Sequence, residues 1–200
     1  MRKLFVPASA LVFALFSLTA CGEGGEKIDR SPLPVIAAPP YICEYIPLRA
    51  VELATGVRDP LTSGHFDLEL AGGLGSGSCA VYQRDDERLK ILQVSLSPGG
   101  YAGKVEEQIR DGASPLPEIA AGAVGFYFKD KNSDSDAAYA TLVRGETDIT
   151  IQLEIGVNGR DNAADVAALM KLIAPKLITD ASASSVSPSP KTPSPSPEKS

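Results

Sequence analysis

The two ends of the chain differ sharply in composition from its middle, and this contrast limits what can fold. Residues 21–39 are rich in glycine and proline, and residues 181–200 are mostly serine and proline. Neither stretch has the apolar density that a core requires, so we expect 21–39 to be a flexible linker and 181–200 a disordered tail. One domain remains, residues 40–180, an ordinary size for a single hydrophobic core.

Residues 1–20 have the pattern of an export signal peptide. Arg2 and Lys3 precede an uncharged, mostly apolar run that ends in Leu-Thr-Ala-Cys, with the cysteine at position 21. The run is short for a membrane span, which needs about 20 apolar residues, and a basic start before such a run is typical of a signal peptide. An ordinary signal would end Ala-x-Ala, whereas this ending resembles a bacterial lipobox.

The lipobox predicts that the thiol of Cys21 is the site of lipidation. Cleavage would leave Cys21 as the new N-terminus, carrying acyl chains such as palmitate, and two such chains hold a protein on a membrane where one is marginal. We therefore expect a lipid anchor on the outer, extracytoplasmic face of the cell membrane. An uncleaved anchor and plain secretion with an unmodified cysteine are the alternatives.

The two other cysteines, Cys43 and Cys79, form an even pair in a chain expected in an oxidising compartment. This context predicts a disulfide bond, which would stabilise the fold by about 4 kcal/mol on the chain-entropy account. A metal site would need further ligands, yet His65 is the only histidine and the chain has no CxxC motif. A cysteine nucleophile would need a reduced thiol beside that histidine.

The middle of the chain alternates between strand and helix patterns. The spacing of apolar residues and the positions of proline and glycine predict helices over 43–56, 101–112 and 162–178. Alternating or β-branched runs predict strands over 65–70, 79–83, 88–97, 123–130, 137–145 and 147–156, and 71–78 is expected to be a flexible loop. These elements favour a single α+β domain, with an antiparallel sheet of about five to six strands and helices on one face.

The lipobox, the segment Cys-Glu-Tyr-Ile-Pro-Leu, the Gly-rich loop and Cys-Ala-Val-Tyr together resemble an actinobacterial lipoprotein domain family of unknown function. The resemblance covers about residues 41–178. It implies that the first cysteine opens a helix, that the second enters a strand, and that the two are paired. The positions concerned are Cys43, Leu48, Leu53, Gly56, Cys79 and Tyr82. Tyr82 stands where the family usually has tryptophan, and we expect the tyrosine ring to pack as that tryptophan would. The resemblance implies a location and a fold, and no activity.

The motifs that suggest chemistry are incomplete, so we expect no catalytic residue, no metal site and no cofactor. The glycine-rich stretch 72–77 lacks the strand–loop–helix context of a dinucleotide site. Residues 130–136 begin like a calcium loop, but Ser135 and Thr141 stand where that loop needs glycine and glutamate, so a solvated turn is the expectation. There is no G-x-S-x-G motif for a serine hydrolase, and no pair of acidic residues stands out by its spacing.

Charge and composition also limit the partners. The formal net charge is −6, with no basic cluster, so no nucleic-acid partner is expected. The remaining hypothesis is a non-catalytic binding or accessory module of the cell envelope, held by a lipid anchor. Its partner would be a protein, a cell-wall fragment or a small apolar ligand. An envelope enzyme of unrecognised type is the alternative. An apolar pocket with few polar groups would favour binding, and converging titratable groups would favour catalysis.

Overall fold

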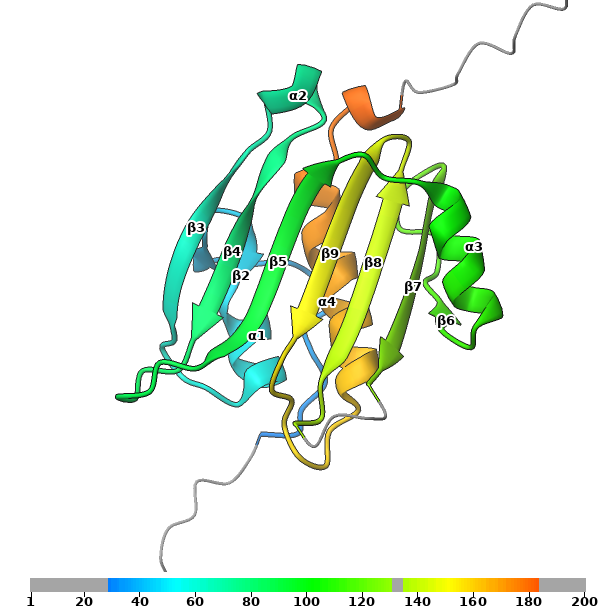
Figure 1. Cartoon of the computed structure of the whole chain (residues 1–200). Coiled ribbons are helices and arrows are strands. Elements are labelled where there is room, and N and C mark those ends of the chain that lie inside the picture. Colours follow the sequence, from blue (N-terminus) through cyan, green and yellow to red (C-terminus); the bar gives the residue numbers. More distant parts are fainter. Residues whose placement is uncertain (1–28, 131–134, 184–200) are drawn as a thin grey trace, which may run out of the picture.

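One antiparallel sheet of seven strands organises the domain. In the computed structural model, residues 29–130 and 135–183 are described, and the strand order is β3-β4-β5-β9-β8-β7-β6 (Figure 1). The strands are β3 (Leu61–Asp67), β4 (Ser76–Tyr82), β5 (Lys90–Pro98), β6 (Ser114–Pro115), β7 (Ala123–Lys129), β8 (Ala138–Arg144) and β9 (Thr147–Leu153). A separate two-stranded ribbon consists of β1 (Tyr41–Ile42) and β2 (Ile46–Pro47).

Helices α1 (Leu48–Thr55) and α4 (Asn162–Leu177) pack on one face of this sheet and bury the main core. Alternate residues of each strand point into this core, as Ile149, Ile151 and Leu153 do from β9. Helix α4 supplies apolar residues from several of its turns, and its first turn is capped by the Asp161 side chain, which accepts a hydrogen bond from the Ala164 N–H. Helix α4 lies against β7, β8 and β9, and the same core cluster extends to β4 beside the β1–β2 ribbon.

Helix α3 (Ala102–Arg110) lies on the opposite face of the sheet, over β7 and β8. Its Val105 is buried with Phe126 and Val143 in a second, small apolar cluster. The structure thus confirms the α+β class and the single antiparallel sheet. It differs from the expectation in having seven strands and in placing one helix on the second face.

Other boundaries differ from those expected because glycine and proline mark more than one kind of turn. Helix α1 begins only at Leu48, after Pro47, so Cys43 does not open a helix. Instead Cys43 and Glu44, both with positive φ, form the turn of the β1–β2 ribbon. The expected loop 71–78 contains part of α2 (Leu70–Gly73) and the start of β4. The short helix η1 (Ala181–Ala183) ends the described chain.

Residues 29–39, expected to belong to a flexible linker, lie against the domain. We call this segment the strap. Leu33 is only 7% exposed and belongs to the main core cluster. Asp29 forms an ion pair with Arg49 at 2.6 Å, and the Arg160 guanidinium donates to the carbonyl oxygens of Asp29 and Ser31. The strap is ordered because Leu33 and these hydrogen bonds fix it in place, although its composition is proline-rich.

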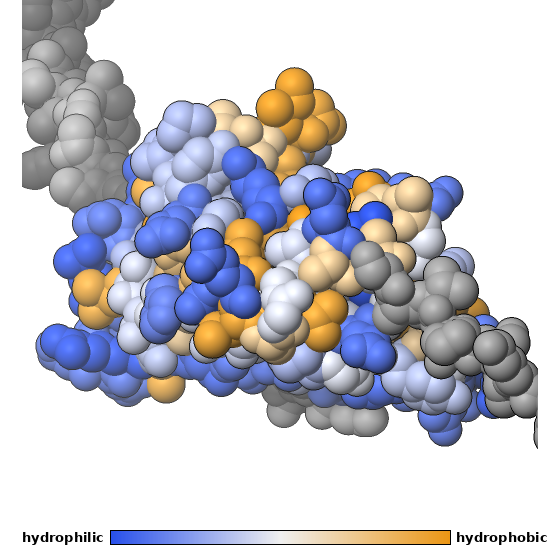
Figure 2. Space-filling model, turned by 90° about the horizontal axis from the view of Figure 1, so that it is seen from above, coloured by the Kyte–Doolittle hydropathy of each residue, from blue (hydrophilic) through white to orange (hydrophobic). Residues whose placement is uncertain are grey.

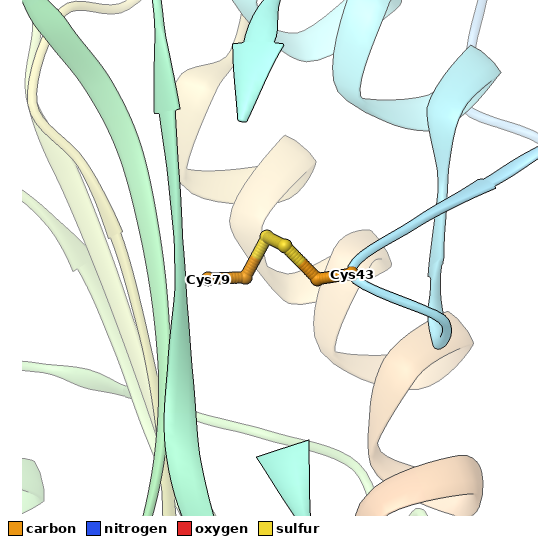
Figure 3. The surroundings of a disulfide bond; sticks show 2 residues. All are labelled: Cys43 and Cys79. Carbon is orange, nitrogen blue, oxygen red and sulfur yellow. A yellow bond between two sulfur atoms is a disulfide. The ribbon is translucent and has the colours of Figure 1, made fainter. Parts of the chain in front are cut away.

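The predicted disulfide between Cys43 and Cys79 is confirmed. It joins the turn of the β1–β2 ribbon to β4, with a Cα–Cα distance of 6.0 Å (Figure 3). Cys79 is fully buried, so the bond passes through the main core cluster. It therefore ties the segment that leads into α1 to the sheet.

Candidate functional site

The face of the sheet opposite α1 and α4 is lined by small polar side chains. The strand register places four hydroxyl groups side by side across β4, β5, β9 and β8: Ser78, Ser95, Thr150 and Thr141. A parallel row contains Gln93, Gln152 and Tyr139. Because successive residues of a strand alternate between faces, these polar residues are the counterparts of the buried apolar ones. We call this surface the open face.

A cleft of about 280 Å³ lies where α3 meets the open face. Its apolar lining comes from Val105, Phe126 and Val143, each at most 4% exposed. Polar groups complete the lining, among them Asp148 at the start of β9 and Thr141 on β8. We call this site the Asp148 cleft. Its volume lies just below the range of about 300–1,000 Å³ typical of small-molecule sites, so it would hold only a small ligand.

Asp148 is the acidic group of this cleft, and it is partly buried. The Thr150 hydroxyl donates a hydrogen bond to Asp148 Oδ1 at 3.1 Å, and the Thr150 and Thr141 hydroxyl oxygens are 3.3 Å apart. No described residue donates to Asp148 Oδ2. Burial raises the pKa of Asp148 above its usual value, while the Thr150 hydrogen bond and the charge of Lys104 partly offset this effect. One carboxylate oxygen is therefore left for a ligand.

Lys104 and Tyr101, at the start of α3, form the mouth of the cleft. Tyr101 is 72% exposed, and its ring lies against Gly103. A Cβ atom at position 103 would come within 2.5 Å of that ring, so glycine is needed for this arrangement. Lys104 forms no ion pair with any described residue, and its ammonium group is exposed. The mouth thus carries one aromatic ring and one positive charge.

A second hollow of about 280 Å³ lies at the other end of α3 and is lined by Asp111, Phe128 and Lys129, among others. Phe128 stacks on Phe126 at 6.1 Å and on Tyr139 at 5.2 Å between ring centroids. These rings therefore form an aromatic strip on the open face between the two hollows. Of the two carboxylates that line the second hollow, Asp111 is exposed and Asp130 is partly buried.

The end of the domain that carries α2 and η1 shows several separate hydrophobic patches among polar side chains (Figure 2). In the described residues of this view, no single large apolar surface marks a docking site for a partner. The Asp148 cleft, with its buried apolar lining and its carboxylate, is the better candidate site.

The sequence motifs do not come together in a second site. His65 is exposed on the edge strand β3. In the calcium-like segment, 131–134 lie outside the described residues, and Asp136 forms an ion pair with Lys129. Within 29–130 and 135–183, no three histidine, cysteine, aspartate or glutamate side chains are placed to hold a metal ion. Cys21, the predicted signal peptide and the chain from residue 184 onward lie outside the described residues.

Sequence reasoning missed the residues of the Asp148 cleft. The alternation in Thr147–Leu153 predicts that Asp148 and Thr150 share the polar face of a strand. It does not predict that α3 (Ala102–Arg110), far earlier in the chain, lies over that face.

No helix within the described part of the chain combines the length and the apolar character needed to cross a membrane. No protein-family model and no curated protein matches this chain. The resemblance to the actinobacterial lipoprotein family therefore stays a prediction.

Proposed function

We propose that this protein is a lipoprotein anchored to the outer face of the cell membrane through Cys21, and that its domain binds a small ligand without catalysing a reaction. The observation that carries the binding proposal is the Asp148 cleft. Its buried apolar lining suits the body of a small apolar molecule. The free oxygen of Asp148 suits a hydrogen-bond donor, and a cationic donor most of all.

The apolar lining and the Asp148 carboxylate together indicate the class of ligand. A carboxylate that is partly removed from water is stabilised by an ammonium group that replaces the lost hydration. Thr150 already orients the other carboxylate oxygen, so the acceptor is held in place before the ligand arrives. We therefore expect a small aliphatic ammonium compound, with its chain against Val105 and Val143 and its nitrogen at Asp148.

The surroundings of Asp148 support binding rather than acid–base catalysis. His65, the only histidine, lies on β3, which is three strand positions from β9. At about 4.8 Å between strands, this separates the backbone at His65 from that at Asp148 by at least about 14 Å. Catalytic partners need hydrogen-bond contact, at about 3 Å. Cys43 and Cys79 are joined in a disulfide and so offer no nucleophilic thiol.

The strap also relates the proposed anchor to the cleft. Asp29 is held by Arg49 of α1 and by Arg160, just before α4, on the side of the sheet that the helices cover. The chain from Cys21 to Asp29 can reach at most about 29 Å when fully extended. The anchor would therefore hold the helical side of the domain near the membrane. The Asp148 cleft, on the other face of the sheet, would point away from it.

The anchor is tested by substituting Cys21 with alanine in the full-length chain. We expect the wild-type protein to partition into the detergent phase and Cys21→Ala to move to the aqueous phase. Its thermal unfolding should be unchanged, because the described core consists of residues from Leu33 onward. Equal partitioning of both proteins into the detergent phase would mean that the signal segment itself is the anchor. Aqueous partitioning of both would mean that the chain is simply secreted.

The binding proposal is tested with three compounds that share one branched five-carbon body: 3-methylbutylammonium, 3-methylbutanol and 3-methylbutanoate. We expect isothermal titration to give the tightest binding for the ammonium compound, weaker binding for the alcohol and none for the carboxylate. Tighter binding of the carboxylate would show that Lys104 rather than Asp148 selects the ligand. Equal binding of all three would show an apolar site without charge recognition, and either result would overturn the assigned ligand class.

A further inference from the structure

Strand β3 leaves one long edge of the sheet uncovered. Its seven residues, Leu61–Asp67, pair with β4 on one side, and no described strand pairs with the other side (Figure 1). Residues 62–65 are exposed. Such an edge offers unpaired N–H and C=O groups to another strand. Proteins usually protect a long edge with lysine, proline or a covering segment, and β3 contains neither lysine nor proline.

The opposite edge of the same sheet is protected in the usual way. Strand β6 has only two residues, Ser114 and Pro115, and a proline cannot donate a backbone hydrogen bond. The contrast shows that the sheet ends at β6 and is left open at β3. Because an uncovered edge of seven residues can pair with another strand, we looked for a strand that could bind the β3 edge.

We propose that a second copy of this chain binds the β3 edge, with the two β3 strands antiparallel across a twofold axis at Gly64. In this register all seven residues pair: Gly64 faces Gly64, Ser63 faces His65, and Leu61 faces Asp67 of the second copy. The contact is isologous, so it closes at two subunits and leaves no further free β3 edge. The result is a continuous sheet through both domains.

The register would also place the negative charge of Asp67 in one copy near the positive charge of Arg88 in the other. A hollow of about 450 Å³ lies along the first half of β3, lined by Leu61, Thr62, Ser63, Tyr82 and Arg88. The twofold register brings the second copy's Asp67 opposite Leu61, and so beside this hollow and Arg88. The same contact occurs twice by symmetry. Opposite charges across strands stabilise a pairing, and this pair would specify the antiparallel register.

The position of the strap is also compatible with a dimer of anchored chains. The twofold axis of two antiparallel edge strands runs perpendicular to the sheet. Both straps then emerge on the same, helix-covered side, and both Asp148 clefts face the other side. Two lipid anchors could therefore enter one membrane. This last point rests on the proposed anchor, whereas the strand pairing does not.

The mass of the full-length chain in detergent, measured by multi-angle light scattering with the detergent contribution subtracted, tests the dimer. We expect a dimer for the wild type and a monomer for Ser63→Lys, which places an exposed lysine on the edge. Ser114→Lys, the matched control on the β6 edge, should remain dimeric. A monomeric wild type would overturn the proposal, and so would a dimer that Ser63→Lys leaves intact.

A cysteine cross-link tests the register independently. When two differently tagged full-length chains are produced together, one with Ser63→Cys and one with His65→Cys, oxidation should link them, because facing residues have Cβ atoms about 5 Å apart. Two chains that both carry Ser63→Cys should not link, because diagonal neighbours lie about 7–8 Å apart. Absence of the first link, or equal yields of both, would contradict the register. Detergent partitioning of Cys21→Ala reports the anchor alone, so either proposal can fail without the other.

Discussion

Replacing Leu33 with alanine tests whether the strap is part of the folded domain. Leu33 is 7% exposed, although it stands between two prolines in a stretch whose composition predicts a linker. The substitution removes three carbon atoms from an apolar contact, and at about 0.8 kcal/mol for each buried methylene this costs about 2.4 kcal/mol. Core leucine-to-alanine substitutions cost about 2–5 kcal/mol, and a surface strap can close over the gap, so we expect about 2–3 kcal/mol.

Urea unfolding of the two proteins, followed by circular dichroism, measures this loss. With a denaturant dependence of about 2.5 kcal/mol/M, the midpoint should fall by about 1 M. Val35→Ala is the matched control in the same strap, because Val35 is 92% exposed and should change stability by no more than about 0.5 kcal/mol. If Leu33→Ala unfolds at the same urea concentration as Val35→Ala, the strap contributes no packing and the orientation argued from it fails.

Three further predictions concern bonds and charges in the domain. Substituting Cys43 with serine and Cys79 with alanine together should lower the free energy of unfolding by about 4 kcal/mol, since the bond closes a loop between residues 36 positions apart; unchanged urea unfolding after reduction would contradict this. Arg160→Met should lower the free energy of unfolding by about 3–5 kcal/mol, because the Asp165 side chain, which is 10% exposed, loses its partner. The double variant Arg160→Met/Asp165→Leu should recover part of that loss. A double variant less stable than Arg160→Met alone would contradict coupling of the pair. Burial raises the pKa of Asp148 in the folded chain, so the folded state binds the proton more tightly and the stability of the fold falls as pH rises through that pKa. Asp148→Asn should therefore unfold at a higher temperature than the wild type at pH 7, and the difference should disappear below pH 3.8. A variant less stable than the wild type at pH 7 would refute the assigned cause.

The strands and the main helices could be predicted because their patterns are local. In β9 the alternation of apolar and polar residues indicates both the strand and its two faces, and the structure buries Ile149 and Ile151 as that pattern predicts. The disulfide could be predicted because two cysteines in a domain that is expected to be exported leave one pairing. Helix α4 shows apolar residues at helical spacing over its whole length.

The remaining features depend on contacts between distant segments. Val105 marks the apolar side of α3, but its spacing to other apolar residues cannot tell which face of the sheet the helix covers. The burial of Leu33 could not be predicted from a proline-rich composition, because it depends on the contacts that Arg49 and Arg160 make with Asp29. The Asp148 cleft combines both difficulties, since its polar residues come from different strands and part of its wall comes from a distant helix. Only the folded arrangement brings Lys104 near Asp148.

The most direct test of the central claim is an NMR titration of the wild-type protein, Asp148→Asn and Asp111→Asn with 3-methylbutylammonium. Asp111 lies in the second hollow and is the matched control. A hydrogen bond to a charged group contributes about 1.5–3 kcal/mol, so Asp148→Asn should bind about 10- to 100-fold more weakly, while Asp111→Asn binds like the wild type. The amide signals of Val143 and Thr150 should shift most. Undiminished binding to Asp148→Asn, or shifts centred on the second hollow, would contradict the Asp148 cleft as the binding site.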